Sequence, residues 1–91
     1  MWYVYIVQCA DQSLYTGITK DLDARLVQHN AGNGAKYTRA RRPVQLVYSE
    51  RAVGRGPAQQ RESAIKHMGT AAKHRLIATA ARGQCNSRVG L

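Results

Sequence analysis

The sequence has few acidic residues, few cysteines and no long apolar stretch. Its 91 residues include five Asp and Glu and two Cys. No segment approaches the roughly 20 apolar residues that span a bilayer, so the sequence predicts no membrane segment. The N-terminus lacks a positively charged segment before its apolar residues, which argues against a signal peptide and for a cytoplasmic protein. Cys9 and Cys85 have neither CxxC nor zinc-ligand spacing, so free thiols explain them most simply.

The scarcity of acidic residues leaves a large positive charge. Fourteen Lys and Arg against five Asp and Glu give a net charge of +9, and the pI is near 10.3. A chain of this length forms one domain. For so basic a domain the favoured partner is a polyanion, and we expect nucleic acid. The charge indicates binding and carries no information about catalysis.

Residues 2–18 predict a β-hairpin. Side chains of the first run alternate between two faces, with Trp2, Val4 and Ile6 on one and Tyr3, Tyr5 and Val7 on the other. A second alternating run covers residues 14–18. The polar residues 10–13 between the two runs are typical of a turn, so the two strands are expected to pair.

A helix is predicted directly after the hairpin. Leu22, Leu26 and Val27 recur at helical spacing, and Thr19 or Asp21 is available as the N-cap. The glycine-rich residues 32–34 are expected to end this helix, because they permit left-handed backbone.

Reactive side chains from the hairpin and the helix are expected to meet. Arg25 and His29 lie one helical turn apart beside the apolar stripe. Tyr5 and Tyr15 come from the two strands of the hairpin, so all four side chains converge where helix meets sheet. Each residue also has a structural explanation, such as strand packing for a tyrosine or an ion pair between Arg25 and Asp21.

A basic segment follows, over residues 35–42. Basic residues surround one aromatic ring in it: Lys36, Tyr37, Arg39, Arg41 and Arg42. This composition suits a phosphate backbone with a base or sugar against the ring. A solvated basic loop anchored by Tyr37 is equally compatible with it.

The remaining chain predicts one strand and two helices. The strand covers residues 44–49, with Val44, Leu46 and Tyr48 on one side and Gln45, Val47 and Ser49 on the other. Residues 50–56 form a connector, and a second helix runs from Pro57 to about Met68. A third helix covers residues 71–82 and ends at Gly83. The domain is therefore expected to comprise residues 1–82, with a flexible tail at 83–91.

Glu62 is the acidic residue that the predicted secondary structure leaves unexplained. It lies between Ala58 and Ile65 on the buried side of the second helix, where an unpaired charge costs several kcal/mol. Either Lys66, one turn further on, or a metal ion would neutralise it. The other four acidic residues belong to turns or to element ends, so a single-metal site fits better than a two-metal site. A zinc site built from His29, His67, His74 and the cysteines has no supporting spacing.

The order and spacing of these residues resemble the GIY-YIG endonuclease superfamily, in particular its small stand-alone single-domain branch. The matching residues are Tyr3-Val4-Tyr5, Tyr15-Thr16-Gly17, Asp21-Leu22, Arg25, His29-Asn30 and Arg61-Glu62. The likeness extends from about Trp2 to Ile77. It implies an α+β fold of ββαβαα order, with a three-stranded antiparallel sheet flanked by helices. Tyr3 and Thr16 depart from the name-giving triplets in the way common to the small branch.

The resemblance also implies metal-dependent hydrolysis of phosphodiester bonds with one Mg²⁺ or Mn²⁺ ion. Tyr5, Tyr15, Arg25 and His29 match its catalytic positions, Glu62 its metal-binding glutamate, and Gly17 a glycine where a side chain would crowd the site. Arg25 would stabilise phosphoryl charge, Tyr5 or His29 would act as base, and Tyr15 would orient the water or a phosphate oxygen. An asparagine found near the C-terminus of several active relatives has Asn86 as its candidate.

Two functions are compatible with these features. One is a metal-dependent endonuclease acting on DNA rather than RNA, with little sequence specificity, in DNA repair or processing. The other is a non-catalytic nucleic-acid-binding module of the same fold. Both use the basic residues of segment 35–42 together with Lys66. Metal binding by Glu62 beside Tyr5 and Arg25 distinguishes the two.

Overall fold

The computed structural model describes the backbone of residues 1–89 and the side chains of residues 1–80. The elements in chain order are β1 (Trp2–Gln8), β2 (Leu14–Thr19), α1 (Leu22–Ala31), α2 (Lys36–Arg39), β3 (Gln45–Ala52), α3 (Arg55–Lys66) and α4 (Thr70–Val89). The predicted α+β class is confirmed. None of the described helices is long and apolar enough to cross a membrane.

The sheet is antiparallel, with strand order β2-β1-β3. Strand β1 is central, and the predicted hairpin joins it to β2. The backbone N–H of Cys9 donates to the carbonyl of Ser13 at 2.8 Å, which closes the turn. The register places Tyr5 directly opposite Gly17 on β2 and Ser49 on β3.

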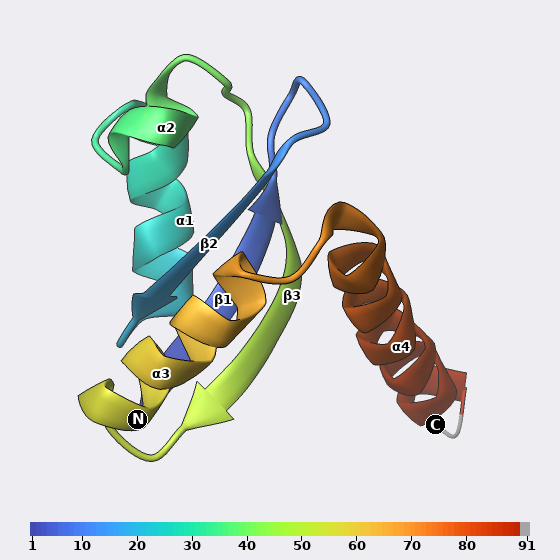
Figure 1. The fold of residues 1–91 in the computed structure, drawn as a ribbon. Helices are drawn as coiled ribbons and strands as arrows, with labels where there is room; N and C mark the ends of the chain where they lie inside the picture. Colours follow the sequence, from blue (N-terminus) through green and yellow to red (C-terminus); the bar gives the residue numbers. More distant parts are fainter. Residues whose placement is uncertain (90–91) are drawn as a thin grey trace.

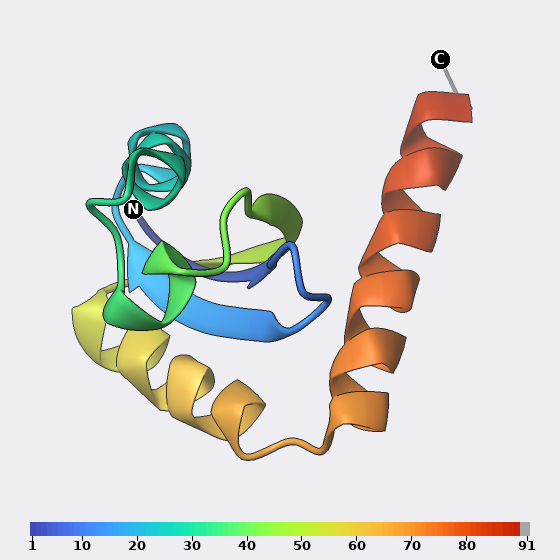
Figure 2. The same cartoon turned by 90° about the horizontal axis from the view of Figure 1, so that it is seen from above.

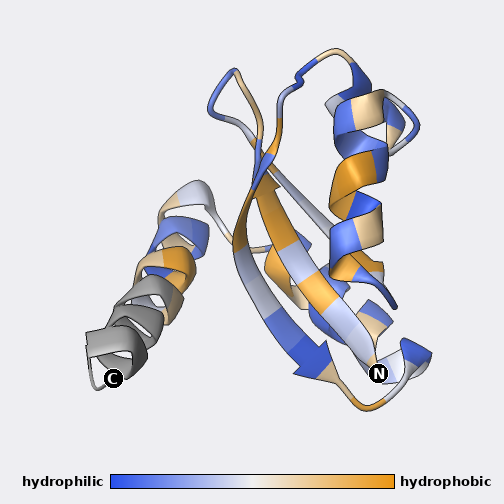
Figure 3. Cartoon of the chain, turned by 180° about the vertical axis from the view of Figure 1, so that it is seen from behind, coloured by the Kyte–Doolittle hydropathy of each residue, from blue (hydrophilic) through white to orange (hydrophobic). Residues whose placement is uncertain are grey.

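Helices cover both faces of the sheet. Helix α1 lies over one face and α3 over the other, as Figures 1 and 2 show, and α4 stands beside β3. The buried hydrophobic residues on the α3 side are Val4, Ile6, Ala58 and Ile65. Those on the α1 side are Tyr5, Val7, Cys9 and Val44. The apolar centre of the sheet is visible along β1 in Figure 3, and the predicted two-faced alternation of this strand is confirmed.

Helix α1 begins and ends close to the predicted residues. Asp21 is its N-cap, and its carboxylate accepts a hydrogen bond from the backbone N–H of Ala24 at 3.1 Å. Gly32 ends the helix with φ of 88°. Leu22 and Leu26 pack on the sheet, but Val27 is 67% exposed. The expectation that Val27 joins the apolar stripe is wrong, because it lies about 100° around the helix from Leu26.

The third strand differs from its predicted pattern. Strand β3 continues to Ala52, so the first residues of the expected connector are strand. A register shift between Ile6 and Val7 interrupts the pairing with β1. Tyr48 consequently packs on the α3 side, whereas Leu46 lines a pocket on the α1 side. The predicted common face of these two residues is wrong, because the bulge breaks the two-residue period.

Three helix predictions also need correction. Helix α3 begins at Arg55 and ends at Lys66, so Pro57 lies within its first turn, where backbone N–H groups need no helical partner. Residues 36–39, expected as a loop, form the short helix α2, in which the carbonyl of Ala35 accepts from two backbone N–H groups. Helix α4 passes through Gly83 and continues to Val89. A lone glycine costs a helix only about 1 kcal/mol, and no proline follows to stop it.

Candidate active site

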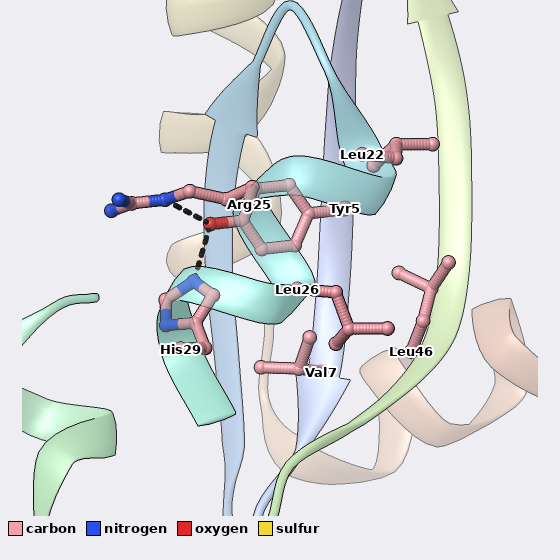
Figure 4. A pocket seen from close by; sticks show the side chains of 7 residues that line it. All are labelled: Tyr5, Val7, Leu22, Arg25, Leu26, His29 and Leu46. Atoms are coloured by element: carbon pink, nitrogen blue, oxygen red, sulfur yellow. Dashed lines mark hydrogen bonds between the residues drawn. The ribbon is translucent and has the colours of Figure 1, made fainter. Parts of the chain in front are cut away.

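The hydroxyl of Tyr5 lies at the centre of a cluster formed with Tyr15, Arg25 and His29. Its oxygen lies 2.9 Å from Nε2 of His29, and Nε of Arg25 donates to it at 3.4 Å (Figure 4). Tyr5 comes from β1, whereas Arg25 and His29 come from successive turns of α1. The structure thus brings together three of the four side chains whose convergence the helical spacing predicted.

Tyr15 is the fourth member of the cluster. It lies on β2 and meets the edge of the His29 ring at a centroid separation of 5.5 Å. Its ring also stacks on Tyr37 of α2, with centroids 6.0 Å apart. The guanidinium of Arg41 in turn lies 4.0 Å from the centroid of Tyr37. Tyr15 therefore connects the buried cluster to the basic segment.

Gly17 provides the space that the Tyr5 hydroxyl occupies. A Cβ atom at Gly17 would lie 2.6 Å from the hydroxyl oxygen of Tyr5, closer than non-bonded atoms approach. The strand register, in which the two residues face each other, is the cause. A side chain at this position would therefore displace the phenol from Arg25 and His29.

Replacing Gly17 by alanine is expected to destabilise the fold by about 1–3 kcal/mol, the usual cost of overpacking. Equilibrium urea denaturation measures the change in the free energy of unfolding. Gly56→Ala is the matched control, because a Cβ there meets nothing within 4 Å. Gly17→Ala with wild-type stability would show that Tyr5 has room to move.

His29 is neutral at physiological pH. It is completely buried, and this burial lowers its pKa below the ordinary value of 6.5, with the charge of Arg25 acting in the same direction. The unfolded chain takes up a proton near pH 6.5, whereas the folded chain does not. The contribution of His29 to stability is therefore complete above pH 6.5 and is lost as the pH falls below it.

Tyr5 is a neutral phenol in this environment. Burial raises its pKa above 10.0, and the charges of Tyr15 and Glu62 raise it further. The hydrogen bond and the charge of Arg25 lower the pKa but do not outweigh burial. Arg25 by itself therefore does not bring the pKa of Tyr5 below its ordinary value. The imidazole of His29 lies within hydrogen-bond distance of the phenol.

Glu62 lies on the sheet-facing side of α3. Its side chain is 22% exposed, and one carboxylate oxygen lies 3.5 Å from Nζ of Lys66, so the predicted neutralising partner is present. The carboxylate also acts on the hydroxyl of Tyr5, whose pKa it raises through its charge. Glu62 therefore lies within electrostatic reach of the Tyr5 hydroxyl.

The single carboxylate of Glu62 fits a hard cation that keeps most of its waters. It does not fit a metal ion enclosed by several protein ligands. The described residues contain no group of three or more His, Cys, Asp or Glu able to hold an ion. Mg²⁺ and Mn²⁺ bind through one or two carboxylates, retained waters and substrate phosphate, so a single carboxylate such as Glu62 would be enough to hold such an ion. Asn86 lies on α4, beyond the side chains that the structure describes.

The arginines of the basic segment differ in the contacts that they make within the chain. Arg41 pairs with Asp11 at 3.1 Å and donates to the carbonyl of Tyr37 at 2.7 Å. Arg42 donates to the carbonyl of Arg39 at 2.9 Å. These two guanidinium groups hold the segment in place, which composition alone did not show. The side chains of Lys36, Arg39 and Arg42 are all exposed, so they can face a polyanion.

Two features of the site were missed by sequence reasoning. Arg61 donates through Nε to both carboxylate oxygens of Glu50 at 3.0 Å, and Tyr48 donates to the same carboxylate. This network anchors α3 to β3 one residue before Glu62. The Arg61-Glu62 pair in the sequence was the feature that could have indicated it. The second feature is Thr38, which is completely buried against His29.

The fold and the cluster around Tyr5 agree with what the resemblance to GIY-YIG endonucleases implied. The family model described as the GIY-YIG catalytic domain matches residues 1–74 of this chain. The chain therefore belongs to the GIY-YIG family, a nuclease superfamily.

Within this family the chain is similar to small proteins named UPF0213. The UPF0213 protein of Natronomonas pharaonis is 51% identical over 76 residues, which cover 84% of this chain and 89% of that protein. That of Staphylococcus saprophyticus is 52% identical over 75 residues, covering 82% and 92%. The solution NMR structure of the Bacillus halodurans UPF0213 protein has a TM-score of 0.56 and 41% identity, covering 87% of this chain and 85% of that one.

Proposed function

We propose that the protein is an endonuclease that hydrolyses phosphodiester bonds in DNA, with one divalent metal ion and little sequence specificity. The observation that carries this proposal is the placement of the Tyr5 hydroxyl between the guanidinium of Arg25 and the imidazole of His29. A phenol that contacts both a fixed cation and a neutral base is equipped to pass on a proton while negative charge develops nearby.

The side chains divide the chemistry of hydrolysis among them. A water that attacks phosphorus transfers its proton to the Tyr5 oxygen, as the phenolic proton moves to Nε2 of His29. The P–O bond to the leaving sugar oxygen breaks, and that oxygen takes up a proton from solvent water. Arg25 remains protonated throughout and stabilises the charge on the phosphoryl oxygens. Glu62 would hold Mg²⁺ or Mn²⁺, which when bound polarises the phosphate and acidifies water. Tyr15, at the border of the cluster, orients the water or a phosphate oxygen.

A cationic hollow beside the cluster suits the DNA backbone. Tyr15 borders it together with Leu14, Thr16, Tyr37, Lys66 and Lys73. No acidic side chain is among these lining residues, and two lysines are. Because Tyr15 belongs both to this hollow and to the cluster around Tyr5, a strand lying in the hollow would lead to the reactive groups. Lys36 and Arg39 extend the positive surface on α2.

The test is cleavage of DNA by the purified protein with Mg²⁺ or Mn²⁺, compared with EDTA. A double variant, Arg25→Ala with Glu62→Gln, is purified in the same way and assayed in parallel. Metal-dependent cleavage by the wild type alone supports the proposal, whereas equal cleavage by both reveals a contaminant. Binding of DNA without cleavage under any metal would favour the non-catalytic binding module. In either case the affinity should fall by about 0.9 log unit per log unit of salt for each phosphate contacted on duplex DNA.

A further inference from the structure

Thr38 joins the basic segment to the buried cluster. Its side chain on α2 is completely buried, and its hydroxyl oxygen lies 2.8 Å from Nδ1 of His29. The same hydroxyl donates to the carbonyl oxygen of Ala35 at 2.9 Å. The basic segment thus inserts one neutral side chain next to the imidazole of His29.

The position of the hydroxyl proton determines which nitrogen of His29 carries a proton. A carbonyl oxygen has no proton, so the hydrogen between Ala35 and Thr38 belongs to Thr38. The Thr38 oxygen can then only accept from the imidazole, which requires a proton on Nδ1. In the neutral ring this leaves Nε2 as a bare acceptor, facing the hydroxyl of Tyr5 at 2.9 Å.

The imidazole is also confined sterically. A Cβ atom at Gly34 would clash with Nδ1 of His29, so the backbone of this glycine packs directly on the ring. Gly34 precedes α2, which means that one short segment both covers the ring and supplies its hydrogen-bond acceptor. The ring and its tautomer are therefore set by the same residues, 34–38.

We infer that Thr38 is a positioning residue, which holds His29 in the Nδ1–H tautomer so that Nε2 is free to receive the proton of Tyr5. The inference rests on the proposed nuclease function for its catalytic consequence. In the opposite tautomer, Nε2–H would donate to the Tyr5 oxygen, and the phenolic proton would have no acceptor. After proton transfer the imidazolium still donates from Nδ1 to Thr38, so the same hydrogen bond serves both charge states.

The test combines the tautomer of His29 with cleavage activity. Long-range ¹H–¹⁵N spectra of the full-length protein, above the pKa of His29, distinguish a protonated ring nitrogen from a bare one. The wild type is expected to carry the proton on Nδ1. Thr38→Val removes the acceptor and keeps the shape, so we expect the proton to move to Nε2 and cleavage to fall on the order of 10²-fold. Thr38→Ser, which keeps the hydroxyl, should restore both.

Two results would overturn the inference: a wild-type ring protonated on Nε2, or an Nδ1–H ring retained in Thr38→Val. Should Thr38→Val fail to fold, the wild-type and Thr38→Ser spectra still decide the tautomer. The spectra need no substrate, so they test the position of the ring proton independently of cleavage. A protein that does not cleave DNA would contradict the proposed function but not the assignment of the ring proton. Val53→Ala, at a side chain that is 91% exposed, serves as the spectral control.

Discussion

Replacing Glu62 by glutamine is expected to reduce DNA cleavage by about 10²- to 10³-fold or more, because the metal contributes several kcal/mol of transition-state stabilisation. An amide has almost the same size as the carboxylate but lacks the charge that holds a hard cation. The fold should be retained, since the pair between Glu62 and Lys66 is partly exposed and such pairs contribute about 0–1 kcal/mol.

Cleavage rates measured over a range of Mg²⁺ and Mn²⁺ concentrations test this prediction. Titration calorimetry with the metal alone supplies a second measurement that does not depend on activity. Asp23→Asn is the matched control, because it makes the same chemical change at an exposed position in the first turn of α1. Unchanged metal binding and cleavage in Glu62→Gln would show that Glu62 does not bind the metal, and this would contradict the proposed mechanism.

Replacing Arg25 by alanine is expected to slow cleavage by about 10²- to 10³-fold, the usual cost of losing one preorganised donor to a developing oxyanion. Arg25→Lys should recover only part of this loss, because an ammonium group lacks the planar fork of the guanidinium. DNA binding should change less than cleavage, since most of the positive charge lies elsewhere on the molecule.

The pKa of His29 gives this second prediction a readout apart from activity. The charge of Arg25 lowers the pKa of His29, so its removal should raise the titration midpoint, while burial still keeps that midpoint below 6.5. Histidine ring resonances followed by NMR against pH measure the midpoint. Arg51→Ala, at an exposed position on β3, is the charge-matched control. A midpoint that does not move in Arg25→Ala would indicate that Arg25 does not act on this cluster.

Local sequence patterns account for much of the site. The two-residue alternation of β1 places Tyr5 on one face of the sheet, and the spacing of α1 places Arg25 and His29 on the side of the helix that meets that face. Both patterns depend on strand and helix geometry that is the same in every protein. Residue spacing alone therefore predicts on which face these side chains lie.

Features that depend on how elements meet were predicted less well. The bulge between β1 and β3 moves Tyr48 to the opposite face from Leu46, and no pattern in the sequence predicts this shift. The guanidinium of Arg41 pairs with Asp11, 30 positions away in the chain, which the residues around Arg41 do not indicate. Long-range partners of this kind leave no signature in neighbouring residues.

The amino-acid sequence by itself determined the hairpin, the first helix and the set of reactive side chains, because periodicity and capping act over a few residues. Only the tertiary structure decided the environment of those side chains. Burial keeps His29 neutral and Tyr5 protonated, and α2 brings the hydroxyl of Thr38 to the imidazole. Charge state and tautomer depend on solvent exclusion and on partners distant in the chain, which exist only once the elements have packed.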